Sequence, residues 1–280
     1  MEKLEADLGS NEPDTDAYLK SLIVTNPLAE LVIPSAIRAL ELPPGSRGLD
    51  AGCGIGLQSL LLAEAVGPGG HVTGLDVAPP FLARGRDIVQ EAGFSERISF
   101  REGSVAALPC DDDTFDWVWS SNCVGYGPWE PLPLVRELAR VVKPGGIVAL
   151  LAWSSEQLLP GYPLLEARLL ATSAGLAPFT KRSAPERHFL RSLGLFRELG
   201  LRDPQARTFV GGAQAPLSAD LREALIALIE MRWPGVESEL VPEEAAEFRR
   251  LCKPESPDFL LDHPDYYAFF TETLFWCKVA

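Results

Sequence analysis

The sequence predicts an α/β protein built on a doubly wound sheet with helices on both faces. Two observations point to this fold. In the first half of the chain, short apolar runs of strand length alternate with segments of helical periodicity. The first run ends at Asp50, and a loop with glycine at every second position (Gly52, Gly54 and Gly56) then leads into a helix.

The segment before the first strand is predicted to be helical. Its apolar residues recur at helical spacing in two short stretches. Proline interrupts the pattern at Asn26-Pro27 and again at Pro34, because its ring removes a backbone donor. We therefore expect residues 1–44 to form a helical segment of two short helices.

The strands and helices that follow are bounded by turn residues and by changes of periodicity. Helices are predicted from residue 57 and over residues 80–92 and 132–142. Strands are predicted from residue 47 and over residues 71–76, 97–103, 115–122 and 147–153.

The composition limits the classes of function. The chain has 280 residues, 46% of them hydrophobic, enough for one large α/β domain with insertions. Acidic residues outnumber basic ones by 39 to 25, giving a formal charge of −14. This balance disfavours a nucleic-acid partner, which needs a basic surface.

Cysteine usage and hydropathy set further limits. Five cysteines without a C-x-x-C pair indicate neither a disulfide framework nor a zinc site, so no metal is expected. The N-terminal residues are charged and lack an apolar signal segment, and no apolar run is long enough to span a bilayer. We expect a cytoplasmic protein.

Two carboxylates near the glycine loop indicate the kind of ligand. Asp50 stands two residues before the first glycine, where a negative charge would repel a pyrophosphate and would suit an amino group. Asp76 lies twenty positions after Gly56, where doubly wound folds place the acid that binds ribose hydroxyls. Asp76 therefore predicts an adenosine ligand without choosing between NAD and S-adenosylmethionine.

Four segments resemble motifs of the class I S-adenosylmethionine-dependent methyltransferases that act on small molecules. They are residues 50–56, similar to D-x-G-x-G-x-G; 103–109, similar to G-D-A-x-x-L-P; 115–120, similar to F-D-x-V-x-S; and 142–146, similar to L-K-P-G-G. Their order along residues 45–153 matches that of the family. The sequence departs from the pattern at Ser104, where the family carries an acid.

The resemblance implies a Rossmann-like sheet of seven strands, mostly parallel with one reversed strand, and helical cap insertions. It also implies that residues 1–44 lie over the cofactor site and that residues 45–153 form the cofactor-binding core. The remaining parts are predicted as an insertion at 154–185, a core helix and strand six within 186–211, a helical cap at 212–270 and the final strand within 271–280.

The cofactor implied by the resemblance is S-adenosylmethionine, with S-adenosylhomocysteine as product. Asp50 and the glycine loop would hold its methionine end, Asp76 its ribose, and Ser104 with Val105 its adenine. The full set of predicted cofactor residues is Tyr18, Asp50, Gly52, Cys53, Gly54, Gly56, Gln58, Asp76, Val77, Ser104, Val105 and Ser120.

The acceptor site is less defined by the sequence. Aromatic residues after the fourth strand and in the cap suggest a wall for an apolar or aromatic small molecule, although such clusters also form cap cores. The candidate pocket residues are Asn122, Tyr126, Trp129, Tyr162 and Tyr267. The candidate bases are His188, His263 and Tyr266.

The predicted function is methyl transfer to a small molecule by in-line displacement. Alignment of donor and acceptor in a dry pocket can supply much of the rate, and a base is needed only if the acceptor must lose a proton. Two alternatives remain open at this point: a catalytically silent S-adenosylmethionine-binding partner protein and an NAD-dependent oxidoreductase. The sequence also leaves open a homodimer.

Overall fold

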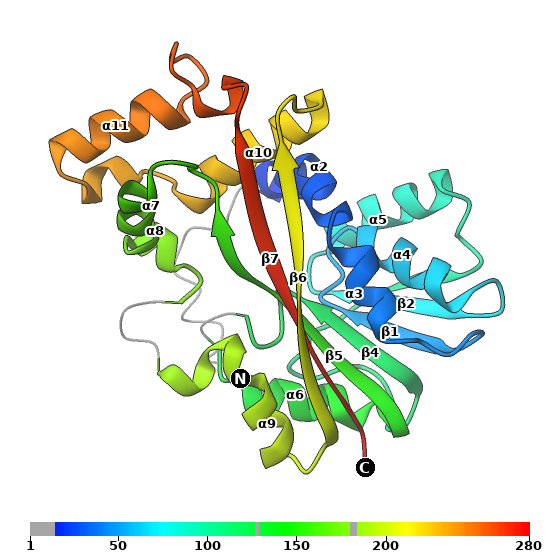
Figure 1. The fold of residues 1–280 in the computed structure, drawn as a ribbon. Helices are drawn as coiled ribbons and strands as arrows, with labels where there is room; N and C mark the ends of the chain where they lie inside the picture. The colour runs from blue at the N-terminus through cyan, green and yellow to red at the C-terminus, as the bar shows by residue number, and fades with distance from the viewer. Residues whose placement is uncertain (1–14, 127–128, 180–183) are drawn as a thin grey trace.

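The computed structural model describes residues 15–126, 129–179 and 184–280. Within these residues, seven strands form one sheet in the order β3-β2-β1-β4-β5-β7-β6 (Figure 1). The strands are β1 (Arg47–Ala51), β2 (His71–Asp76), β3 (Ile98–Glu102), β4 (Phe115–Ser121), β5 (Val142–Gln157), β6 (Arg202–Gln214) and β7 (Tyr267–Lys278). The first five run parallel, and β7 runs antiparallel to both of its neighbours. The predicted fold class is confirmed.

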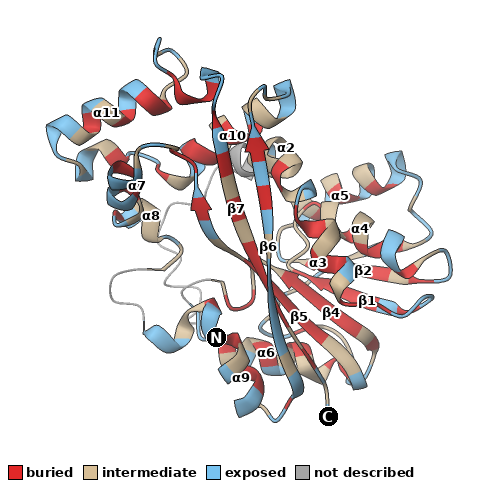
Figure 2. Ribbon diagram, in the orientation of Figure 1, coloured by how far each residue is buried: buried red, intermediate tan, exposed pale blue. Residues whose placement is uncertain are grey.

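Helices cover both faces of the sheet. They are α2 (Thr15–Glu30), α3 (Ile33–Ala39), α4 (Leu57–Val66), α5 (Pro79–Glu91), α6 (Pro131–Arg140), α7 (Pro163–Leu170), α8 (Ser173–Leu176), α9 (Ser192–Glu198), α10 (Ala219–Arg232) and α11 (Pro242–Cys252). One hydrophobic cluster joins α3, α4 and α5 to one face, and a second joins α6 and α9 to the other. The buried strands between them form the core (Figure 2).

The last three strands are longer than the sequence analysis expected. β5 continues four residues past Trp153, β6 ends at Gln214, and β7 already begins at Tyr267. Buried and less buried residues alternate along the start of β7, as a strand with one covered face requires. The aromatic segment near residue 270 is therefore part of the sheet, and the ribbon of β5, β7 and β6 extends beyond the parallel strands (Figure 1).

The extended ribbon is covered by a third cluster that α2 and α10 share, together with α11 and the loops between these helices. In this cluster Leu28 of α2 packs with Leu225 and Leu228 of α10. The sequence pattern predicts a break at Asn26-Pro27, but α2 runs through Pro27 to Glu30. The free energy gained by burying Leu28 offsets the cost of the backbone hydrogen bond that Pro27 cannot donate.

The segments between the core and the ribbon also differ in detail from expectation. In place of the single core helix expected within residues 186–211 there are two 3₁₀ turns followed by the short helix α9. By contrast, α10 and α11 lie within residues 212–270, where the sequence predicts helical structure. In the described part of the chain, no single helix is both long and apolar enough to cross a bilayer, and a bent pair, Leu19–Glu30 with Ile33–Ala39, meets that test by length and composition only.

Candidate active site

The glycine loop between β1 and α4 has the backbone conformation that its glycines allow. Gly52, Gly54 and Gly56 have φ angles of 81°, 54° and 76°, a region that other residues rarely adopt. A Cβ on Gly52 would lie 2.6 Å from the sulfur of Cys123, so only glycine fits there. In front of Gly54 the nearest atom to such a Cβ is in Leu22 of α2, at 3.7 Å. The N-terminal helix therefore lies over the loop.

Asp76, at the carboxyl end of β2, holds the glycine loop. One oxygen of its carboxylate accepts the N–H of Gly54 at 2.9 Å, and the other accepts the N–H of Ala78 at 3.0 Å. Val77 beside it is 63% exposed, so an apolar side chain faces solvent next to the carboxylate. Each oxygen keeps a lone pair for a further hydroxyl donor.

Asp50 is the second carboxylate near the loop, and it is buried. Its oxygen accepts a hydrogen bond of 2.6 Å from the hydroxyl of Ser59 on α4. Burial raises the pKa of Asp50 to about 7, the Ser59 hydroxyl opposes this rise, and the charge of Asp76 adds to it. The carboxyl of Asp50 therefore titrates near neutral pH.

Two predicted cofactor residues have structural partners inside the protein. The side chain of Gln58 accepts the indole N–H of Trp119 at 2.8 Å and donates to Ser121 at 3.2 Å. Ser120 is fully buried, and its hydroxyl donates to the carbonyl of Ala51 at 2.9 Å. These bonds tie α4 and β1 to β4 and so hold the loop in place.

The other predicted cofactor residues lie around the same edge. Ser104 is exposed, and its hydroxyl accepts the N–H of Ala106 at 3.2 Å. Val105 packs against the core. Burial, with Asp50 and Asp76 nearby, raises the pKa of the Cys53 thiol and keeps it protonated. The side chain of Tyr18 lies outside the described part of the structure.

These residues fit the chemistry of S-adenosylmethionine. The glycine loop lets a ligand approach the main chain closely, because its three glycines carry no side chains. Asp76 offers a carboxylate to hydroxyl donors, and the exposed Val77 offers apolar surface to a flat ring. No metal or phosphate-binding group is required by this set of donors.

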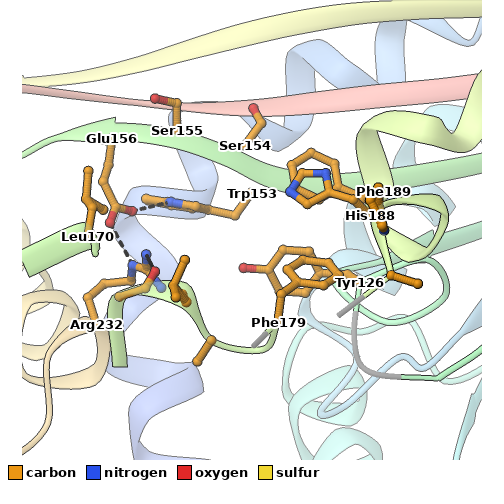
Figure 3. Close-up of a pocket in the computed structure, with 15 residues that line it drawn as sticks. Tyr126, Trp153, Ser154, Ser155, Glu156, Leu170, Phe179, His188, Phe189 and Arg232 are labelled. Atoms are coloured by element: carbon orange, nitrogen blue, oxygen red, sulfur yellow. Dashed lines mark hydrogen bonds and ion pairs between the residues drawn. The ribbon is translucent and has the colours of Figure 1, made fainter. Parts of the chain in front are cut away.

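A pocket of about 410 Å³ opens beside the carboxyl ends of β4 and β5 (Figure 3). Two predicted residues line it, Tyr126 after β4 and His188 before α9. Phe179 contacts both: its ring stacks on His188 with centroids 4.8 Å apart and meets Tyr126 edge-on at 6.0 Å. Phe189 completes this aromatic end, 5.9 Å from Tyr126.

The opposite end of the pocket is polar. Glu156 on β5 accepts the Nε–H of Arg232 at 2.7 Å and the indole N–H of Trp153 at 2.5 Å. Arg232 also donates to the carbonyl of Gly175 at 3.1 Å. The side chain of Glu156 is 2% exposed and that of Arg232 is 16% exposed, so this ion pair is largely shielded from water. Figure 3 shows Trp153 between the polar end and the aromatic end.

Charged residues at and near the polar end affect the pKa of Tyr126 at the aromatic end. Burial raises the pKa of the Tyr126 phenol, Arg232 lowers it, and Glu156 with Glu272 raises it. The phenol is therefore protonated at neutral pH and can donate a hydrogen bond into the pocket. Burial lowers the pKa of His188, and its Nδ1 accepts the N–H of Leu190 at 3.3 Å.

Asn122 connects β4 to the extended ribbon. It follows β4 with a φ of 47°, and its Oδ1 accepts the N–H of Trp153 at 2.8 Å. Its side chain also bonds to the carboxyl of Glu272 on β7. Burial raises the pKa of Glu272 to about 7. Among the described residues, the Oε2 atom of Glu272 has no hydrogen-bond partner.

The remaining predicted residues do not line this pocket. Tyr266 is buried in the cluster under α10, where its hydroxyl donates to the carbonyl of Leu158 at 3.3 Å. His263 is exposed and ends a 3₁₀ turn. Trp129 and Tyr267 are both about half exposed, at 52% and 51%. Tyr162 packs beside Arg250 before α7.

The residues that line the pocket include Trp153, Glu156, Phe179, Phe189 and Arg232, none of which was singled out from the sequence. Glu272, which pairs with Trp153 from the neighbouring strand β7, was not singled out either. The antiparallel pairing of β5 and β7 places Glu156 opposite Phe270 and Glu272 opposite Trp153. No local sequence pattern reveals this register. The sequence signal was weak: Glu156 follows two serines after the apolar part of its strand, and Glu272 stands between two threonines in a strand that is otherwise mostly apolar or aromatic.

Curated proteins similar to this chain include methyltransferases. A family model described as a methyltransferase domain matches residues 49–146. The demethylmenaquinone methyltransferase of Bacillus subtilis (strain 168) is 33% identical over 196 residues, which are 64% of this chain and 81% of that protein. The protein of the same name from Lysinibacillus sphaericus is also 33% identical, over 64% of this chain and 80% of its own length.

Solved structures share the fold at lower identity. The YcgJ protein from Bacillus subtilis aligns with a TM-score of 0.52 at 18% identity, over 88% of this chain and 97% of its own. A geranyl diphosphate methyltransferase in complex with S-adenosylmethionine aligns with a TM-score of 0.51 at 16% identity, over 99% and 95% of the two chains. None of these similarities supports an NAD-dependent oxidoreductase or a catalytically silent binding protein.

Proposed function

This chain belongs to the class I S-adenosylmethionine-dependent methyltransferases, and on that premise we propose that it methylates a small molecule whose reacting part is a flat, apolar ring. The observation that carries the proposal is the pocket beside the ends of β4 and β5, with its aromatic walls. Its volume of about 410 Å³ is within the usual size range of ligand sites. Since the relatives above are named for demethylmenaquinone, a demethylated quinol is the first acceptor to test.

The methyl donor is proposed to lie over the glycine loop. Asp76 would accept hydrogen bonds from the ribose hydroxyls, and Val77 would contact the adenine. The carboxylate of Asp50, near the end of β1, would attract the ammonium group of the donor electrostatically. When bound, S-adenosylmethionine supplies a methyl group attached to a positively charged sulfur, and this methyl group is open to attack by a nucleophile.

The protein's own part in the reaction is proposed to be alignment and exclusion of water. Tyr126, Phe179 and Phe189 would hold an aromatic ring by contact with its faces and edges. Holding two reactants at near-attack distance can lower the barrier by about 7–11 kcal/mol. Tyr126 would donate its phenolic hydrogen bond to an oxygen on the acceptor, because its proton is retained at neutral pH.

The test is an assay of purified protein with S-adenosylmethionine and one acceptor at a time, measuring S-adenosylhomocysteine by mass spectrometry. The acceptors are a short-chain demethylmenaquinol, kept reduced with dithionite, and a small polar acid such as glycine. We expect product only with the quinol, and a Trp153→Ala variant should lose it, because Trp153 lines the middle of the pocket. Methylation of the small polar acid alone would contradict the proposal.

A further inference from the structure

The ion pair at the polar end of the pocket holds a cation in a defined orientation. Arg232 is the last residue of α10, and Glu156 lies in the extension of β5. Glu156 accepts one hydrogen bond on each oxygen, from Arg232 and from Trp153, so neither the carboxylate nor the guanidinium can rotate freely. The indole of Trp153 is itself stacked on Phe270, with ring centroids 4.9 Å apart and planes 9° apart.

Part of the guanidinium is left for a ligand. Arg232 uses Nε for Glu156 and Nη2 for the carbonyl of Gly175. In the described part of the chain, Nη1 has no hydrogen-bond acceptor from the protein, and it is not among the buried unpartnered atoms either. Arg232 lines the pocket, so this end of its planar donor group faces the cavity.

The pocket therefore joins two kinds of surface. Its aromatic end offers ring faces and edges, and its polar end offers N–H donors (Figure 3). Glu156 balances the charge of Arg232, so the polar end is suited to a hydrogen-bond acceptor and does not require an anion. A ligand that fits both ends is a flat ring that carries an oxygen substituent.

We propose that Arg232, oriented by Glu156, is a specificity-determining residue that donates hydrogen bonds to a hydroxyl or carbonyl oxygen on the ring of the acceptor. This inference rests on the proposed function, since it takes the pocket to be the acceptor site. It adds the residue that recognises the acceptor's oxygen, and with it a preference for oxygen-substituted aromatic rings over the bare hydrocarbons. Sites built to hydrogen-bond a substrate group strongly reject analogues that lack it, because their buried donors then stay unpaired.

The test compares two probes that differ by one oxygen, 1-naphthol and naphthalene. Binding is measured by calorimetry, with the full chain saturated with S-adenosylhomocysteine. In the wild-type protein we expect 1-naphthol to bind at least about ten-fold more tightly than naphthalene, as one hydrogen bond from a charged donor would give. Removing the pair should reduce this preference to the part that the Tyr126 phenol supplies, and leave the affinity for naphthalene unchanged.

The variant is chosen so that the pocket still folds. Arg232→Met alone would leave the buried carboxylate of Glu156 without its cation, which is strongly destabilising. The double variant Glu156→Gln, Arg232→Met removes both charges and keeps similar volumes, and an amide at 156 can still accept from Trp153. The matched control is Arg222→Met, on the same helix, whose partner Asp262 lies outside the pocket.

The outcomes separate this inference from the proposed function. Equal preference for 1-naphthol in the wild type and the double variant would overturn the role of Arg232 and leave the acceptor pocket standing. A parallel loss of both probes and of S-adenosylhomocysteine affinity would mean that the pair only holds α10 to the sheet, which also overturns the inference. If neither probe binds the wild-type protein, the pocket is not an aromatic acceptor site and both proposals fail.

Discussion

The carboxylate of Asp76, at the end of β2, accepts the backbone N–H of Gly54 in the middle of the glycine loop at 2.9 Å. One side chain thus fixes the shape of the loop and also stands where the ribose of the methyl donor is proposed to lie. Binding of the donor and order of the loop are therefore coupled through one residue. Loss of the carboxylate removes both contributions together.

We predict that Asp76→Ala lowers affinity for S-adenosylhomocysteine by at least about 100-fold, because two hydrogen bonds from hydroxyls to a charged acceptor are each worth about 1.5 kcal/mol or more. Calorimetric titration measures the effect, with S-adenosylmethionine and NAD titrated alongside. The control is Glu102→Gln, which removes an exposed acid at the end of the neighbouring strand β3. Unchanged affinity in Asp76→Ala would remove Asp76 from the proposed site.

Asp50 predicts a pH dependence of donor binding. Its pKa is raised to about 7, so its carboxylate is mostly protonated below that pH and mostly charged above it. The charged form attracts an ammonium group, so affinity for S-adenosylmethionine should rise between pH 6 and 7.5. Ser59→Ala removes the hydroxyl that opposes the rise in pKa, and should shift the midpoint to higher pH.

The measurement is the dissociation constant at half-unit steps of pH for the wild-type protein and for Ser59→Ala. Asp76 also faces this region, and its charge contributes to the raised pKa of Asp50. An Asp50→Asn variant isolates the effect, since it should bind more weakly and with a flat profile. A profile that is the same in all three proteins would show that another group controls the pH dependence.

The fold was predictable from the sequence because its signals are local, and the residues of the candidate cofactor site lie close together for the same reason. The glycines of the loop, Asp50 and Asp76 lie within a single strand-loop-helix-strand segment, and their spacing alone places them at one edge of a parallel sheet. The extended strands β5 and β7 were underestimated, since their ends carry polar residues and aromatic residues that also suit a cap.

The proposed acceptor pocket could not be predicted in the same way. Its walls come from β5, from the segment before α9 and from the end of α10, and only the tertiary fold brings these together. Tyr126 was singled out because it lies in an aromatic-rich segment after the fourth strand, and His188 because a histidine can act as a base near neutral pH. Arg232 was not singled out, since an arginine in the last turn of a helix is already explained by its favourable interaction with the helix dipole.

The phenol of Tyr126 provides a further test of the pocket. Tyr126→Phe removes one neutral hydrogen-bond donor and keeps the ring contacts with Phe179 and Phe189. We predict that the acceptor's KM rises about three- to ten-fold, as one such bond gives, with no change in affinity for S-adenosylhomocysteine. Tyr162→Phe, outside the pocket, is the matched control. Equal kinetics in the two variants would contradict a contact between Tyr126 and the acceptor.

Glu272 makes a prediction about stability. It is buried on β7, its Oε2 has no partner among the described residues, and its pKa is raised from the usual 4.5 to about 7. Between these two values the native state holds a proton that the unfolded chain has released. The free energy of unfolding therefore falls as pH rises from about 4.5 to 7, and levels off above that.

Glu272→Gln should remove this contribution, because its side chain stays neutral at every pH. We predict that the variant is more stable than the wild-type protein by up to about 3 kcal/mol at pH 8, since one pKa unit corresponds to about 1.4 kcal/mol, and that the difference shrinks towards pH 4.5. Urea denaturation at several pH values measures it. The exposed Glu255→Gln is the control, and Asp50 contributes equally to all three proteins. A gain in stability that did not depend on pH would mean that Glu272 keeps its proton throughout, and that packing alone sets its cost.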